Sequence, residues 1–183
     1  MLKVLDSRAE LSDHPPPGKE ALMGNEKLGK AERLQDYEKY YRSCYRWAKF
    51  FDLIDMAWVY CPDSDREGEL DKVTDFYLPD QDSYFNVGTW RPGRGRVDYG
   101  KLSDKCEKLI VIGYDQGGFH VFEHGHHYPP SDSLMCRCTE CGRFYFLNAP
   151  GTYVCRVCGA YDGDHHLARM IFGNECLFEM IER

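Results

Sequence analysis

The chain has 183 residues and is 43% hydrophobic, 29% charged and 14% aromatic, so it can bury a sizeable core. This composition excludes collagen-like, disordered and low-complexity chains, and no apolar run approaches the roughly 20 residues of a membrane span. We therefore expect no transmembrane segment. Twenty-three Lys and Arg residues against thirty Asp and Glu residues give a net charge of −7, which makes nucleic-acid binding unlikely on charge grounds.

Residues 1–30 predict an extended arm. His14 is followed by three prolines, and the segment shows no apolar period. It also lacks the apolar core of a secretory signal and the Arg-rich, acid-poor composition of a mitochondrial transit peptide. We expect this arm to lie extended on a larger surface or to be disordered.

Residues 31–61 predict one long amphipathic helix. Apolar residues recur at steps of three and four from Leu34 to Trp58 without Pro or Gly, and a proline after Cys61 ends the pattern. Additional aromatic residues such as Trp47 widen the apolar stripe. A stripe of this width either packs within the protein's own core or docks in part on a partner subunit.

Residues 62–107 predict a loop-rich linker, because prolines and glycines interrupt every apolar run in this stretch. So long a connection is uncommon in a compact isolated domain. It is natural in a subunit that drapes over other subunits of a large complex.

Residues 108–183 predict a small β-domain. The apolar runs 109–113 and 119–123 flank a glycine-rich turn and indicate a hairpin. The runs 143–147 and 152–154 flank a turn with Asn, Pro and Gly and indicate a second hairpin. Together with the helix, these strands predict an α+β fold.

Cysteines carry the strongest chemical signal in the chain. There are nine, and nothing in the sequence indicates an oxidising compartment, so clustered pairs favour a metal over disulfides. Two segments, which we call the first and second knuckle, repeat the pattern C-x-x-C-G-x-aromatic at residues 138–144 and 155–161. In each knuckle the two thiolates can converge on one ion. Two such knuckles complete a closed tetrahedral site of the structural zinc type. The predicted zinc ligands are Cys138, Cys141, Cys155 and Cys158.

Two alternatives at this site stay open. Cys136 could pair with Cys138 as a C-x-C ligand set, which would leave Cys141 without a role. The second knuckle also resembles the first knuckle of rubredoxin, an iron-containing electron carrier, but no further C-x-x-C follows Cys158.

A short histidine motif suggests a different chemistry. His120, Glu123 and His124 match H-x-x-E-H, the inverted signature of a zinc metalloprotease. That motif requires a helix, whereas the flanking glycines predict a strand on which Glu123 points away from His120. No phosphate-binding loop or nucleophile elbow is present in the sequence. We expect no catalytic activity and no small-molecule substrate.

The knuckles and their surroundings resemble a known family, the zinc-binding nuclear-encoded subunit of cytochrome c oxidase, called Vb in animals. In one register the run 108–113 and the Cys138/Cys141 pair match the family's strand and its second cysteine pair. In the other register Cys136, Cys138, Cys155 and Cys158 match all four ligands, and an aromatic strand lies between the pairs.

The resemblance implies a non-catalytic accessory subunit with a helical N-terminal part, an extended linker and a small zinc-binding β-domain. It implies a place in the respiratory chain, on the matrix side of the mitochondrial inner membrane, with membrane contact only through partner subunits. The alternative is a zinc-ribbon component of a ribonucleoprotein or transcription assembly, against which the acidic net charge counts.

Overall fold

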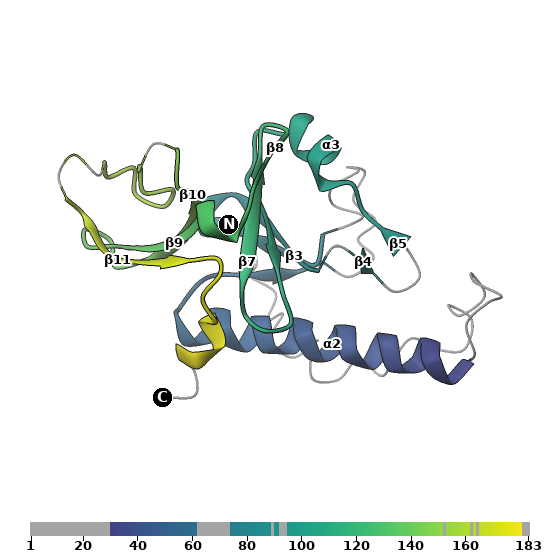
Figure 1. Ribbon diagram of the computed structural model, residues 1–183. Coiled ribbons are helices and arrows are strands. Elements are labelled where there is room, and N and C mark those ends of the chain that lie inside the picture. Colours follow the sequence, from purple (N-terminus) through teal and green to yellow (C-terminus); the bar gives the residue numbers. More distant parts are fainter. Residues whose placement is uncertain are drawn as a thin grey trace, which may run out of the picture.

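The computed structural model describes residues 30–61, 74–88, 90–91, 95–151, 153–161, 163 and 165–180. Residues 1–29 of the predicted arm, and 62–73 of the predicted linker, lie outside this part. The described residues form a long helix, a six-stranded sheet, a three-stranded sheet and short helical turns, which agrees with the predicted mixture of helix and sheet. Figure 1 shows helix α2 along one side of the large sheet and helix α3 on the opposite side.

Helix α2 spans Lys30–Leu53, so it ends earlier than the sequence predicts. The chain leaves the helix through Asp55, whose φ of 52° is left-handed, and the Met56 amide donates to the Phe51 carbonyl at 2.9 Å. Beyond this turn the chain forms strand β1, Val59–Tyr60. The prediction of one helix to residue 61 is wrong at its end, because a buried strand continues the apolar pattern.

The large sheet joins segments from both sides of the predicted linker. Its order is β1-β2-β3-β6-β7-β8, and only β3 and β6 run parallel. The hairpin predicted over residues 109–123 is confirmed as β6 and β7. The strands after β1 are β2 (Phe76–Leu78), β3 (Ser83–Val87), β6 (Ile110–Gly113), β7 (Phe119–Glu123) and β8 (His126–Tyr128).

The prediction of loops throughout residues 62–107 is wrong where β2, β3 and helix α3 (Tyr99–Asp104) form. Every residue of β3 is buried, including Ser83 and Asn86, so the strand shows no alternation of apolar and polar residues. A 3-10 turn, η2 (Pro79–Gln81), joins β2 to β3. The short strands β4 (Trp90–Arg91) and β5 (Gly95–Arg96) pair with each other.

A buried carboxylate fixes helix α2 to the large sheet. The Asp75 carboxylate accepts hydrogen bonds from the Tyr40 hydroxyl of α2 and from the Val87 amide, the latter at 2.7 Å. The Asp75 amide donates to the Asn86 side chain at 3.1 Å. These bonds satisfy polar groups that burial would otherwise leave unpaired.

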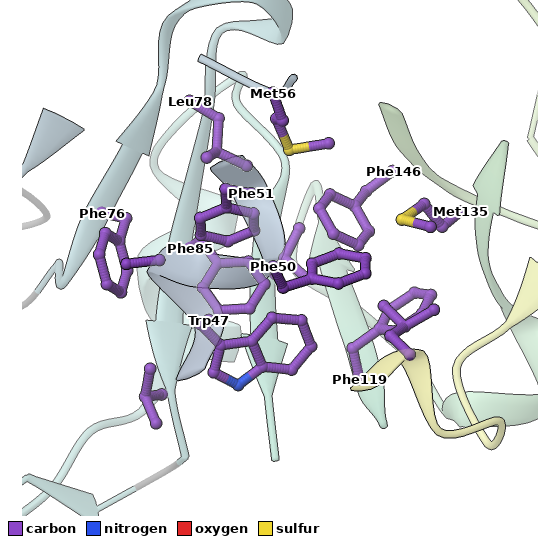
Figure 2. Packing of buried hydrophobic residues seen from close by; sticks show 14 of the residues in the cluster. Trp47, Phe50, Phe51, Met56, Phe76, Leu78, Phe85, Phe119, Met135 and Phe146 are labelled. Carbon is purple, nitrogen blue, oxygen red and sulfur yellow. The ribbon is translucent and has the colours of Figure 1, made fainter. Parts of the chain in front are cut away.

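The main core lies between α2 and the large sheet. Trp47, Phe50 and Phe51 of α2 are fully buried, and the Trp47 ring centre lies 4.7 Å from that of Phe85. Figure 2 shows these rings packed together at the centre of the cluster, and their planes are tilted or edge to face rather than stacked. Most of the aromatic stripe of α2 is thus used within the chain, while Tyr45 remains 43% exposed.

The opposite face of the large sheet carries a smaller cluster. Tyr99 of α3 packs there with Tyr84, Ile110 and Ile112. The sheet is therefore covered on both faces, which explains why β6 is buried along its whole length.

The small sheet has the order β10-β9-β11, and β9 ends at Cys138. The second predicted hairpin is wrong, because β10 pairs with β9 rather than with residues 152–154. Met135 of β9 and Phe146 of β10 join the main core, as Figure 2 shows, which fixes the small sheet to the large one. The remaining elements are β9 (Ser133–Cys138), β10 (Phe144–Asn148), β11 (Leu167–Phe172), η3 (Pro130–Asp132) and η5 (Leu177–Met180).

A glutamine side chain also connects the two sheets. Gln81 of η2 is buried, and its Oε1 accepts a hydrogen bond from the Phe146 amide at 2.9 Å. This amide belongs to β10, an edge strand of the small sheet. The contact therefore covers part of an edge that would otherwise present an unpaired donor.

Candidate metal centre

Four cysteine thiols from two separate loops converge on one point. All four Sγ atoms lie within 4.8 Å of one another, in a group formed by Cys138, Cys141, Cys155 and Cys158. Sγ of Cys138 lies 3.7 Å from Sγ of Cys158, and Sγ of Cys141 lies 3.7 Å from Sγ of Cys155. These separations are too long for disulfides. They match the edge of about 3.8 Å that follows from metal–sulfur bonds of about 2.3 Å in a tetrahedron.

The two knuckles have the same backbone geometry. In each one the glycine after the second cysteine is left-handed, with φ of 72° at Gly142 and 77° at Gly159. Each glycine amide donates to the carbonyl of the first cysteine, at 2.8 Å for Cys138 and 2.9 Å for Cys155. A residue with a side chain would be strained at this φ, which explains the glycine in both copies of the motif.

A second backbone bond closes each knuckle. The amide of the first cysteine donates to the carbonyl five residues later, from Cys138 to Arg143 at 3.0 Å and from Cys155 to Ala160 at 2.7 Å. Both loops are therefore held in their ligand-presenting shape by the protein backbone. Their similarity follows from the repeated sequence pattern.

The environment of the thiols governs how readily they lose their protons. Burial raises the pKa of Cys155 to about 12, and burial also raises the pKa of Cys141. A hydrogen bond from the Ala160 amide lowers the pKa of Cys158, the exposed member of the group. Because a metal binds the thiolate form, binding here must release protons from the buried thiols, and affinity should rise with pH.

Cys136 lies outside the group although it is only two residues from Cys138. It is fully buried in the middle of β9, where it pairs with Tyr145 on one side and Met170 on the other. Among the described residues, the converging set contains Cys141 and not Cys136. The arrangement therefore favours C-x-x-C over C-x-C for the first pair.

Each knuckle is attached to the rest of the fold by an arginine. Arg143 of the first knuckle donates to the backbone carbonyl and the carboxylate of Asp55, at 2.6 and 2.9 Å. Arg156, between the cysteines of the second knuckle, donates to the Glu123 carboxylate at 2.5 Å. The sequence analysis did not identify either arginine, because their partners lie far away along the chain.

The H-x-x-E-H motif does not form a metal site of the protease type. His120 and Glu123 lie on strand β7, and His124 lies in the following turn with a φ of 49°. Glu123 accepts hydrogen bonds from Asn148 and Arg156, so its carboxylate is engaged in the packing of the second knuckle. The three residues therefore lack the shared helical face that the motif requires.

Four thiolates at tetrahedral spacing form a donor set that suits zinc or iron. Compared with family models, curated proteins and solved structures, the chain matches none of them. Among the described helices, none combines the length and the hydropathy that crossing a membrane requires. The geometry of the cysteine group therefore carries the functional argument.

Proposed function

We propose that the protein binds one structural zinc ion through Cys138, Cys141, Cys155 and Cys158. The observation that carries this proposal is the convergence of four thiols from two knuckles of equal geometry. Four protein ligands complete a tetrahedral shell and leave no position for water or substrate. The site is thus suited to holding two loops together, and we expect it to catalyse no reaction.

The protein part of the site supports a structural role. The first cysteine of each knuckle, Cys138 or Cys155, is buried in the hydrophobic cluster of the small sheet. The second cysteines lie nearer the solvent. Such a half-buried closed site stabilises loops at the end of a sheet without forming a substrate cavity.

We further propose that the chain acts as an accessory subunit of a larger complex. The support is the resemblance in order of parts to the zinc subunit of cytochrome c oxidase, which would place the chain at the mitochondrial inner membrane. The ligand group departs from that resemblance, since the register that matches four family ligands requires Cys136. The structural zinc role is therefore the more general proposal, and the oxidase assignment depends on it.

The metal is tested by elemental analysis of the purified chain, with Cys136→Ser and Cys141→Ser as a matched pair. We expect one zinc per chain in the wild type and in Cys136→Ser, and less in Cys141→Ser. Iron with visible thiolate absorption would support the rubredoxin-like alternative. Zinc loss confined to Cys136→Ser would overturn the assigned ligand set.

The biological role is tested by disrupting Cys155 and Cys158 in the native host. We expect less assembled oxidase and less of its haem signal in the membrane, with normal turnover in the complexes that remain. A normal amount of oxidase would contradict the oxidase assignment. Copurification of the chain with RNA would instead support the ribonucleoprotein alternative.

A further inference from the structure

A second group of potential metal ligands lies on the large sheet, on residues separate from the cysteine group. Nδ1 of His120 on β7 lies 2.5 Å from the Tyr114 hydroxyl and 3.3 Å from Nε2 of His127 on β8. The His120 ring meets both neighbours edge to face, at interplanar angles of 78° and 80°. Two further lone-pair donors, from Tyr114 and His127, therefore approach Nδ1 of His120.

A single hydrogen bond accounts for only one of the two polar atoms that approach Nδ1 of His120. A ring nitrogen of histidine has one position in its plane, which holds either a proton or a lone pair. Nδ1 of His120 can therefore form only one good hydrogen bond, although two polar atoms approach it. Nε2 of the same ring points away from this group and would not contact the ion; it is buried and has no hydrogen-bond partner within the described part of the chain. The approach of His127 to an Nδ1 atom that already bonds Tyr114 is what calls for a functional explanation.

A metal ion would engage all three donors at once. Metal–nitrogen bonds of about 2.0 to 2.1 Å place two tetrahedral ligands about 3.3 Å apart, the distance between the two imidazole nitrogens here. The Tyr114 oxygen is closer because it forms a hydrogen bond to His120. On metal binding the phenol would release its proton to solvent, and its oxygen would then move outward to a ligand distance. His127 is exposed while His120 is 6% exposed, so the group is reachable from solvent on one side.

We propose that Tyr114, His120 and His127 form a second divalent-metal site, of the nitrogen and oxygen type. Imidazole and phenolate ligands suit zinc, nickel and copper rather than magnesium or calcium. Three protein ligands leave a fourth position open to water or another ligand, in contrast to the closed cysteine site. The proposal does not depend on the function proposed for the cysteines.

The test uses the full chain carrying one equivalent of zinc, to which further Zn²⁺ is added. Calorimetry should show a second binding event, and long-range proton–nitrogen NMR spectra should show shifts at His120 Nδ1 and His127 Nε2. His127→Gln should weaken this event by at least about tenfold. His126→Gln is the matched control, since His126 is also exposed on β8 but points to the other face of the sheet.

Tyr114→Phe provides a separate variant, which keeps the ring and removes only the oxygen ligand. It should weaken the second event while the first equivalent of zinc stays bound to the cysteines. Zinc binding that both His127→Gln and Tyr114→Phe leave unchanged would overturn the proposal, whether or not the cysteines hold a first equivalent. Equal losses in His126→Gln and His127→Gln would also overturn it, because they would indicate unspecific binding to a histidine-rich hairpin.

Discussion

Gly113 is the residue on which packing of the helix against the sheet depends most directly. A Cβ atom at this position would lie 2.4 Å from the Phe85 ring and 2.5 Å from the Trp47 ring. Both rings are fully buried, so neither can move aside without disturbing the core. The glycine thus allows strand β6 to approach the centre of the aromatic cluster.

Gly113→Ala should therefore destabilise the protein by about 1 to 3 kcal/mol through overpacking. Gly100→Ala is the control, because its Cβ would meet nothing closer than 3.5 Å and alanine favours the helix that contains it. Chemical denaturation of both variants measures the difference. Equal stabilities of the two variants would show that the core rearranges to accept the methyl group.

His120 predicts a specific pH dependence. Burial lowers its pKa to about 4 from 6.5, and the nearby His127 contributes to the decrease. The unfolded chain takes up a proton as the pH falls below 6.5, whereas the folded chain does so only near pH 4. The stability that the neutral ring contributes is therefore complete above pH 6.5 and is lost as the pH falls toward 4, by about 3 kcal/mol in total.

NMR titration of the chain with one equivalent of zinc measures this pKa directly. The His120 ring signals should stay constant from pH 8 to about pH 5 and change below that pH. A midpoint near 6.5 for His120 would contradict the burial seen in the structure.

At the scale of elements, the contact between β7 and the second knuckle is the most informative. Glu123 lies at the end of β7 and binds both Arg156 and Asn148, and its side chain is only 12% exposed. The same glutamate belongs to the H-x-x-E-H motif. In the structure its carboxylate contacts the loop that carries Cys155 and Cys158.

Glu123→Gln should reduce stability by about 1 to 3 kcal/mol and leave any zinc bound to the cysteines. A double-mutant cycle with Arg156→Met isolates the contribution of the pair. The exposed Asp98 and Lys101 pair is the control, and its cycle should show no measurable coupling. Zinc-dependent peptidase activity that disappears in Glu123→Gln would instead restore the protease alternative.

At the scale of the whole molecule, the two cysteine loops and the main core pack in separate hydrophobic clusters. The core cluster between α2 and the large sheet contains none of the four grouped cysteines, whereas Cys138 and Cys155 belong to the cluster of the small sheet and Cys141 borders it. Met135 and Phe146 connect the small sheet to that core without contribution from the metal site. The loops can therefore lose order while the sheet packing persists.

Removal of the metal with a chelator should accordingly increase amide exchange by at least about tenfold in the loop residues 139–143 and 153–161, and not in β10 between them. Exchange in α2 and β6 should change little, and added zinc should restore protection in the loops. Hydrogen exchange followed by mass spectrometry measures both regions in one experiment. Cooperative unfolding of the whole chain would show that the core depends on the metal.

The sequence by itself determined the local features of this protein. The start of α2, the β6–β7 hairpin and the shape of both knuckles each depend on residues within a few positions of one another. A glycine at a left-handed turn and two cysteines at fixed spacing act through short backbone geometry. For that reason their patterns are visible without the fold.

Only the tertiary structure decided the pairings between distant segments. β3 is buried on both faces and pairs in parallel with β6, so neither alternation nor a short turn reveals it. β10 pairs with β9, and its other edge is contacted by Gln81, which is distant in sequence. Cys136 and Cys141 offer similar local chemistry, and the position of the second knuckle decides which thiol joins the group. These choices depend on burial and long-range contacts, which a linear pattern does not contain.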